Sequence, residues 1–443
     1  MPQTQPRSSH RLAGVSSMVG TTIEWYDFFI YGAAAALIFN RLFFPNLDPL
    51  TGVLAAFATY AVGFIGRPLG GIIFGHFGDK VGRKSMLLLT LMLMGIPTIL
   101  IGLLPTYETI GYWATVCLVI LRFIQGMAMG GEWGGAVLMA VEHAPEGKKG
   151  FWGSLPQASA GAGLMLASIA LALVSLLPEA ALFSWGWRLP FLASCVLLLV
   201  GWYIRVKVPE SPDFEQVKAK SAEIKVPALS VLQQHPKELI TIIVARAAEN
   251  AWFYIASTFA LAYATTQLEI PRQQVLFAIV CGAALSIVVT PLCGHLSDKI
   301  GQRRLFLCGL TVLALYCYPF FSLLSSQDPV QIWWAFVLAV GIVFPLMYAP
   351  ESMLFARQFP AEIRYSGISI SVQFAGVIGG GLAPLIATKL LAIADGQVHW
   401  VIGYIVSMAV VAIICTLCMK ADRHYQTLPV TTRPNSLDSL DTP

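Results

Sequence analysis

Long apolar segments alternate with short polar connections along the whole chain. The apolar segments are about 20 residues or more in length, and an α-helix of about 20 residues spans the ~30 Å hydrocarbon core of a bilayer. The strict alternation of apolar and polar residues expected of barrel strands is absent. The pattern therefore predicts an all-helical membrane protein. Its twelve expected spans are roughly 14–40, 51–78, 85–104, 111–142, 150–177, 188–206, 238–266, 272–298, 304–325, 330–356, 364–392 and 399–420.

A polar stretch punctuated by prolines divides these spans into two sets of six. The predicted regions are an N-terminal tail at 1–13, a six-helix half at 14–206, a linker at 207–237, a second half at 238–420 and a C-terminal tail at 421–443. Lysine and arginine gather in the linker, near both termini and in every second loop. By the positive-inside rule, both termini and the linker are expected in the cytoplasm.

A short motif occurs once in each half. GHFGDKVGRK begins at Gly75 and GHLSDKIGQRR begins at Gly294, a shift of 219 residues (294 − 75). A repeat at half the chain length indicates two related halves. The motif is similar to the loop motif GxLaDrxGrr of the major facilitator superfamily, whose transporters consist of two six-helix halves.

Composition and charge narrow the function. The chain is 56% hydrophobic and 12% charged, with a mean hydropathy of +0.70, whereas soluble domains are about one quarter charged. The net charge of +4 is spread over loops, which predicts no nucleic-acid partner. Of the eight cysteines, Cys415 and Cys418 have a CxxC spacing, but neither a second pair nor a histidine pattern accompanies them. No GxxxxGK[ST] loop occurs, and no catalytic cluster is evident, so we expect neither a nucleotide-driven pump nor an enzyme, and no cofactor or metal.

Further segments resemble one family of that superfamily, the metabolite:proton symporters. They are TTIEWYDFFIYG (21–32), GFIGRPLGG (63–71), RFIQGMAMGGEWGGA (122–136) and FPAEIRYSG (359–367). Within the family, the chain most resembles the shikimate-type organic-acid carriers. The resemblance implies a monomeric, proton-coupled symporter of the bacterial inner membrane, which imports a small organic acid by alternating access. The alternatives are a proton-coupled carrier of betaine- or proline-like osmolytes and an uncoupled facilitator of the same fold.

Ionisable residues inside a span are costly, so each is a functional hypothesis. Glu24 and Asp27 share a face of the first span. Asp27 lies about 13 residues (~20 Å) into its span, and Arg122 lies about 11 residues (~17 Å) from the outer end of the fourth, so an ion pair near the midplane is expected. An anionic substrate that took over Arg122 would leave Asp27 to bind a proton, which couples the two fluxes. The alternative is a fixed pair that only holds the helices together, and Glu24 is either a second proton carrier or a flanking residue.

Three further residues of the first half are substrate-site candidates. The resemblance implies that Arg67, which precedes a proline, is a cavity or gate residue, whereas its alternative role is hydrogen bonding in helix packing. Trp25 and Tyr31 lie beside the acidic pair in the sequence. They either line the central cavity or pack as ordinary core residues.

The second half has its own interior charges in the seventh span. Arg246 and Glu249 are three residues apart and either pair with each other or offer Arg246 as a second anion ligand. The 219-residue shift places Asp27 on Arg246, so the two halves would present opposite charges to one cavity.

The repeated loops are predicted to control the inner gate. Asp79 and Asp298 can accept hydrogen bonds at a neighbouring helix N-terminus, where the helix dipole favours negative charge. The same shift relates Glu132 to Glu351, and symmetric placement predicts ion pairs at the gate, with Arg357 as a partner of Glu351. The basic loop residues would reach carboxylates such as Glu142. The full gating set is Asp79, Arg83, Lys84, Glu132, Glu142, Asp298, Arg303, Arg304, Glu351 and Arg357.

Overall fold

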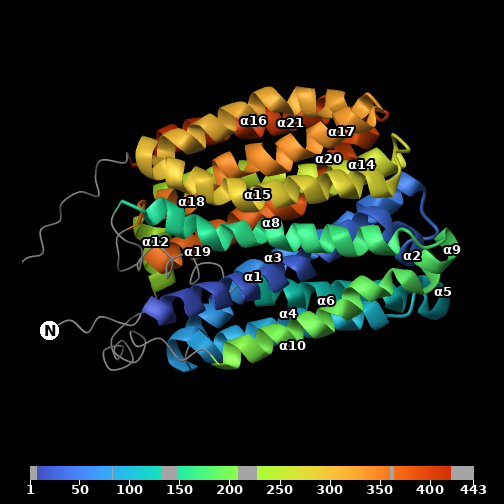
Figure 1. Ribbon diagram of the computed structural model, residues 1–443, viewed down its shortest axis with the longest axis horizontal. Helices are drawn as coiled ribbons and strands as arrows, with labels where there is room; N and C mark the ends of the chain where they lie inside the picture. The colour runs from blue at the N-terminus through green and yellow to red at the C-terminus, as the bar shows by residue number, and fades with distance from the viewer. Residues whose placement is uncertain (1–6, 82, 131–146, 208–226, 360–363, 421–443) are drawn as a thin grey trace, which may run out of the picture.

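The computed structural model describes residues 7–81, 83–130, 147–207, 227–359 and 364–420. In these ranges the regular secondary structure is entirely helical, and the long helices run side by side along one axis (Figure 1). Nine of the described helices are long and apolar enough to cross a membrane, and the bent pair Glu179–Gly186 and Arg188–Tyr203 makes a tenth if it counts as one span. The all-helical membrane architecture expected from the sequence is confirmed.

The N-terminal half contains six long helices and a few short ones at one end. The long helices are α1 (Arg7–Leu37), α3 (Pro49–Val81), α4 (Arg83–Leu103), α6 (Tyr112–Gly130), α8 (Lys149–Val174) and α10 (Arg188–Lys207). The short elements are α2 (Phe39–Phe43), α5 (Tyr107–Ile110), α9 (Glu179–Ala181) and the π-helical turn η1 (Leu182–Gly186). They lie together at the right of Figure 1, which we call the distal end.

The C-terminal half repeats this plan, with π-helical turns inside three of its spans. Its elements are α12 (Pro227–Gln234), α13 (Pro236–Tyr254), η3 (Ile255–Phe259), α14 (Ala260–Thr266), α15 (Arg272–Ile300), α16 (Gln302–Ser325), α17 (Pro329–Leu338), η4 (Ala339–Val343), α18 (Phe344–Ala356), α19 (Arg364–Ala375), η5 (Gly376–Gly381), α20 (Leu382–Ile393) and α21 (His399–Leu417). Gly301 makes the tight turn between α15 and α16 with φ +98°, as expected of a glycine in the repeated loop. We call this end of the bundle the basic end.

Two predicted spans differ from the nine apolar helices in a way that their sequences explain. α1 contains Glu24 and Asp27 and extends over the N-terminal residues from Arg7. The apolar part of α4 is the shorter segment Leu88–Leu103. Helix α12 also occupies part of the stretch predicted as a linker.

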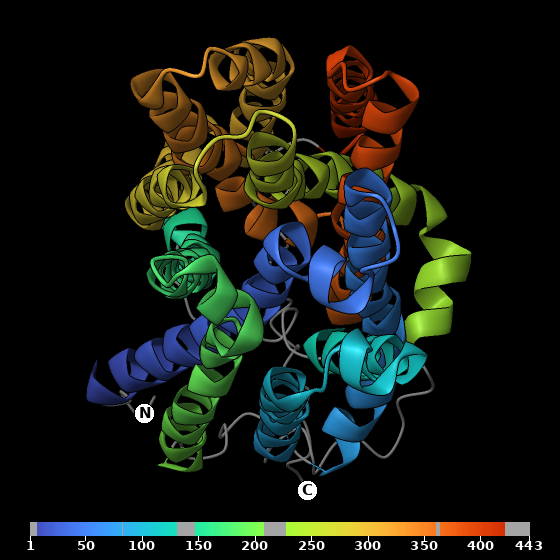
Figure 2. The same ribbon diagram turned by 90° about the vertical axis from the view of Figure 1, so that its right-hand side faces the viewer.

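Viewed from the distal end, the two halves form separate groups of helices, one blue to green and the other yellow to red (Figure 2). They meet along three seams: α8 against α15, α3 against η5 and α20, and α1 against α14. Gly380 and Gly381 of η5 lie against the ring of Phe64 in α3. This glycine-rich turn therefore lies at a contact between the halves.

Within the N-terminal half, α3 and α6 cross with their backbones in contact. A Cβ atom on Gly126 would overlap the carbonyl oxygen of Gly63, and one on Gly70 would overlap that of Met127. Gly130 lies equally close to the carbonyl oxygen of Arg67. Small residues allow this approach in a membrane bundle. The crossing fixes α3 and α6 relative to each other.

Candidate functional site

The guanidinium of Arg122 lies in an aromatic cage at the centre of the N-terminal half. Its Cζ atom is 4.2 Å from the ring centroid of Phe28, 4.3 Å from that of Tyr31 and 4.7 Å from that of Tyr60. Arg122 is fully buried, and its Nη1 donates to Gln125 Oε1 at 3.2 Å. Its Nε and Nη2 have no hydrogen-bond partner. Two nitrogen atoms of a buried cation therefore lack a hydrogen-bond acceptor in this structure.

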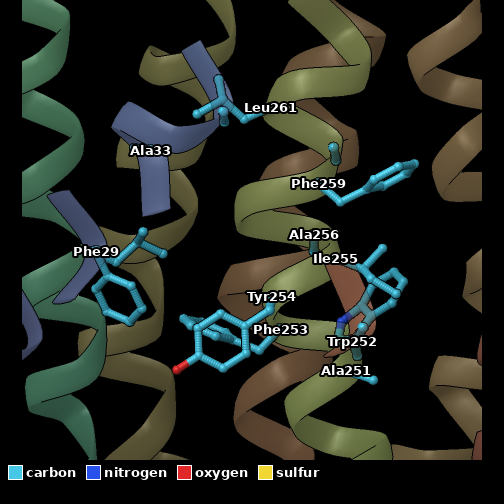
Figure 3. Close-up of a cluster of buried hydrophobic side chains, with 14 of the residues drawn as sticks. Phe29, Ala33, Ala251, Trp252, Phe253, Tyr254, Ile255, Ala256, Phe259 and Leu261 are labelled. Carbon is cyan, nitrogen blue, oxygen red and sulfur yellow. The ribbon is translucent and has the colours of Figure 1, made fainter. Parts of the chain in front are cut away.

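Arg67 of α3 lies on the same aromatic cluster. Its Cζ is 4.4 Å from the ring centroid of Phe28 and 4.2 Å from that of Phe64, and Nη2 contacts Met129 Sδ at 3.0 Å. Tyr254 of α13 reaches the cluster from the other half, and its ring packs against Phe64 at a centroid distance of 5.2 Å. Figure 3 shows Tyr254 projecting from α13, on the side that faces Phe29 of α1.

Together, the two guanidiniums form a buried positive site. Arg67 is 7% exposed and Arg122 is 0% exposed, and no ion pair with a carboxylate is found for either in the described ranges. Aromatic faces stabilise a guanidinium, but they do not neutralise it. An uncompensated buried cation is costly, so the arrangement favours the binding of an anion. A planar carboxylate matches the fork of free N–H groups on Arg122.

Asp27 occupies a separate pocket rather than pairing with Arg122. Its Oδ1 accepts a hydrogen bond from Ser194 Oγ of α10 at 2.5 Å, and Thr98 of α4 is its second side-chain partner. Gln125 Nε2 donates to Thr98 Oγ1 at 2.7 Å. The expected direct Asp27–Arg122 ion pair is therefore absent from this structure. The two residues are connected through Thr98 and Gln125.

Of the other candidate residues in the N-terminal half, one belongs to the aromatic cage and the others lie in the packing between helices. Tyr31 is part of the cage and donates from its hydroxyl to Thr59 Oγ1 at 2.7 Å. Trp25 stacks on Phe29 at 5.1 Å, and its Cβ adjoins Gly163 of α8, which places it in the packing between helices. Glu24 is buried in α1 and engaged in an interaction of its own.

In the C-terminal half, Arg246 of α13 forms an ion pair with Glu351 of α18, from Nη1 to Oε2. The sequence analysis expected Arg246 to pair with Glu249 or to bind the anion, and expected Glu351 to pair with Arg357 at the gate. The partner of Glu351 is therefore corrected from Arg357 to Arg246, in a pair that is buried inside one half. Glu249 also interacts with Arg246, and the anion-binding role of Arg246 stays a prediction. Arg357 Nη1 instead donates to Gln302 Oε1 at 2.8 Å.

The second copy of the repeated loop joins the two halves at the basic end. Asp298 Oδ1 accepts from the Gly150 amide at 2.7 Å, and Oδ2 accepts from the Phe151 amide at 3.0 Å. These amides belong to the first turn of α8, so the carboxylate sits at a helix N-terminus as the sequence predicted. Arg303 donates to the Leu417 carbonyl at the end of α21, whereas Arg304 is exposed.

We expect Asp298→Asn to shift the protein towards the state that is open at the basic end. The amide offers one acceptor oxygen in place of two and removes the charge from the helix N-terminus. The loss should be about 1 kcal/mol, which changes the balance of states about fivefold. Distances between spin labels on the ends of α8 and α15 would measure this shift.

Asp328→Asn is the matched control, because Asp328 caps α17 within a single half by accepting from the Val330 amide. Its label distances should match those of the wild type. An Asp298→Asn protein with an unchanged distance distribution would contradict the gating role of Asp298.

At the distal end, polar contacts also cross between the halves. Gln273 Nε2 of α15 donates to the Ser175 carbonyl at 2.7 Å. Glu179 pairs with Arg41 at 2.5 Å in its own half and lies 3.9 Å from Arg272 of the other half. Arg41, Glu179 and Arg272 are partly or fully exposed, so the ion pairs are weak individually. A pocket of about 310 Å³ opens beside Glu179 and Arg272.

Several residues of the predicted gating set have no described side-chain contacts. The side chains of Asp79, Arg83 and Lys84 and the whole of Glu132 and Glu142 lie outside the described part of the chain.

Sequence reasoning missed most of the cage and the connection between its two polar centres. Tyr60, Phe64 and Arg67 recur at helical spacing and therefore share one face of α3, which is a detectable signal. Gln125 lies one turn from Arg122 in an otherwise apolar helix, and it was equally visible. Ser194 and Thr98 carry no such signal, because hydroxyl residues are common in membrane helices.

Comparisons with known proteins identify the family. Residues 12–239 match the model for "Sugar (and other) transporter", and residues 239–438 match that for "Major Facilitator Superfamily". The chain is 42% identical over 416 residues to the shikimate transporter of Escherichia coli (strain K12), covering 93% of this chain and 95% of that one. It is 32% identical over 420 residues to the proline/betaine transporter of the same organism, covering 93% and 83%.

Solved structures agree on the fold. A crystal structure of a D-xylose–proton symporter superposes with a TM-score of 0.72 at 18% identity, covering 92% of this chain and 97% of that one. A partially occluded inward-open form of the xylose transporter from E. coli gives 0.70 at 17% identity, covering 93% and 97%. The helical fold, its division into two halves and the similarity to these relatives all indicate the same family. This chain is a multi-pass membrane transporter that belongs to the major facilitator superfamily, among its bacterial metabolite transporters.

Proposed function

We propose that this transporter imports a small organic acid together with a proton by alternating access between its two halves. The observation that carries the proposal is that the buried guanidiniums of Arg67 and Arg122 have no carboxylate partner among the residues that the structure describes. They favour an anionic substrate, and the shikimate transporter among the relatives supports a hydroxylated cyclic carboxylate. The protein would work as a monomer in the bacterial inner membrane, with both termini in the cytoplasm.

Proton coupling would operate through the connection between Asp27 and Arg122. In this structure Asp27 has hydroxyl partners and no paired cation, and binding a proton removes the cost of a buried charge. With Asp27 neutral, Arg122 stays in the cage and offers Nε and Nη2 to the substrate. Loss of the proton would draw Arg122 towards the carboxylate, through Gln125 and Thr98, and release the substrate. Each ligand then favours the binding of the other, as linkage requires.

An osmolyte carrier is the alternative that the proline/betaine relative raises. Aromatic cages do bind quaternary ammonium groups. Here, however, two guanidiniums occupy the aromatic faces of Phe28, Tyr31, Tyr60 and Phe64. A betaine cation would meet positive charge at this site, so the geometry supports the acid.

The test is uptake by the purified protein in liposomes, with labelled shikimate, glycine betaine and proline as substrates. We expect shikimate to accumulate when the outside is acidic, and we expect no accumulation of the two osmolytes. Accumulation of betaine or proline alone would establish the osmolyte carrier. Equilibration of shikimate that ignores the pH gradient would establish the uncoupled facilitator.

A further inference from the structure

The interior charges of the C-terminal half gather in one cluster. Arg246 and Glu249 of α13 and Glu351 of α18 are buried, at 4%, 1% and 0% exposure. The charged side chains on the described parts of the neighbouring helices lie near the helix ends. They are Lys149 of α8, Arg272, His295, Asp298 and Lys299 of α15, Arg303 and Arg304 of α16, Lys389 of α20 and His399 of α21. The cluster must therefore balance its own charge.

With every group ionised, two carboxylates face one guanidinium. Arg246 donates to Glu351 Oε2, and the carboxyl groups of Glu249 and Glu351 lie within reach of a hydrogen bond to each other. A hydrogen bond between two carboxyl groups requires a proton on one of them. Glu249 Oε2 and Glu351 Oε1 have no other donor within hydrogen-bonding distance. A single proton supplies the missing donor and makes the cluster neutral.

We propose that Glu249 and Glu351 share one exchangeable proton and form a second proton-binding site, in the half that does not contain Asp27. The other titratable groups that interact with the pair are Arg246 and Tyr254, and Tyr348 of α18 interacts with Arg246. Tyr254 also interacts with Arg67 in the aromatic cluster. The second site is thus connected to the anion site from the C-terminal side, as Asp27 is from the N-terminal side.

This inference goes beyond the proposed function, because it concerns residues that the coupling through Asp27 does not use. Two carboxyl groups that share a site beside one cation lose their protons in two separate steps. After the first proton is lost, the second stays bound to the pair. The transporter would then move one proton more per substrate than Asp27 alone carries.

Infrared difference spectra of the purified full-length protein, recorded during a pH titration, test whether the site exists. We expect the absorption of a buried protonated carboxyl group to persist in Asp27→Asn and to be lost in Glu249→Gln. The glutamine amide can donate to Glu351 in place of the proton, so this variant should fold. Glu351→Gln provides a second variant, in which Arg246 can pair with Glu249. Glu238→Gln is the control, because Glu238 pairs with Lys420 near the start of α13 and should leave the spectrum unchanged.

Reversal potentials in liposomes test whether the proton travels. The proton-to-substrate ratio of Glu249→Gln should be lower than that of the wild type by about one. An unchanged spectrum in both glutamine variants, or an unchanged ratio, would overturn the second site. Failure of the Asp27 mechanism is a different result, namely wild-type accumulation by Asp27→Asn, so the two outcomes are distinguishable.

Discussion

Replacing Asp27 by asparagine should lower accumulation of the substrate by about tenfold per unit of pH gradient while leaving its exchange across the membrane intact. The side chain keeps its size and can still bond to Ser194 and Thr98, so the site should keep its shape. It can no longer bind and release a proton. A one-unit pH gradient corresponds to about 1.4 kcal/mol, or about a tenfold accumulation for each proton coupled. The variant should lose the tenfold factor that the Asp27 proton supplies.

Uptake and counterflow measured on the same liposomes separate these two properties. In the wild type, uptake should rise as the outside becomes more acidic, because protonated Asp27 is the form that holds Arg122 ready for the substrate. In Asp27→Asn the counterflow should persist at any pH in the working range. Asp48→Asn is the control, since Asp48 is an exposed residue that accepts from the Thr51 amide at the start of α3. Wild-type accumulation in Asp27→Asn would refute the proton role.

Replacing Arg122 by alanine should remove substrate binding. The free Nε and Nη2 groups are placed to form two charge-assisted hydrogen bonds to a carboxylate, each worth about 1.5–3 kcal/mol. Losing both weakens binding by at least 3 kcal/mol, or more than about 100-fold. Arg122→Lys should give an intermediate affinity, because an ammonium keeps the charge but not the planar fork.

Calorimetric titration of the purified variants with shikimate measures this effect. Arg41→Ala is the matched control, because Arg41 is an exposed arginine of the same half that pairs with Glu179. Its affinity should equal that of the wild type. A thermal unfolding curve for Arg122→Ala shows whether the cage still folds. A folded Arg122→Ala protein with wild-type affinity would rule out Arg122 as the anion ligand.

The sequence predicted the helical architecture, the two halves and the residue types of the site, but it could not predict the pairing. Depth along a span placed Asp27 and Arg122 at one level, yet depth says nothing of the direction in which each side chain points. α4 supplies Thr98 between them, and that position depends on how three helices pack. The predicted partner of Glu351 was wrong for a related reason. The 219-residue shift identifies equivalent positions in the two halves, but it does not identify equivalent partners. Asp298 was predicted well, since a carboxylate beside a helix N-terminus is a local interaction that repeats with the loop.

The backbone contacts between α3 and α6 affect how the substrate would be carried from one side of the membrane to the other. Both arginines of the anion site stand on these two helices, so the crossing makes them a single rigid unit. When the two halves move relative to each other, the acid would stay bound to the N-terminal half and lose only its contacts to the C-terminal half. The affinity of the site for the acid would then be nearly the same on either side of the membrane. The proton gradient would set the direction of net transport.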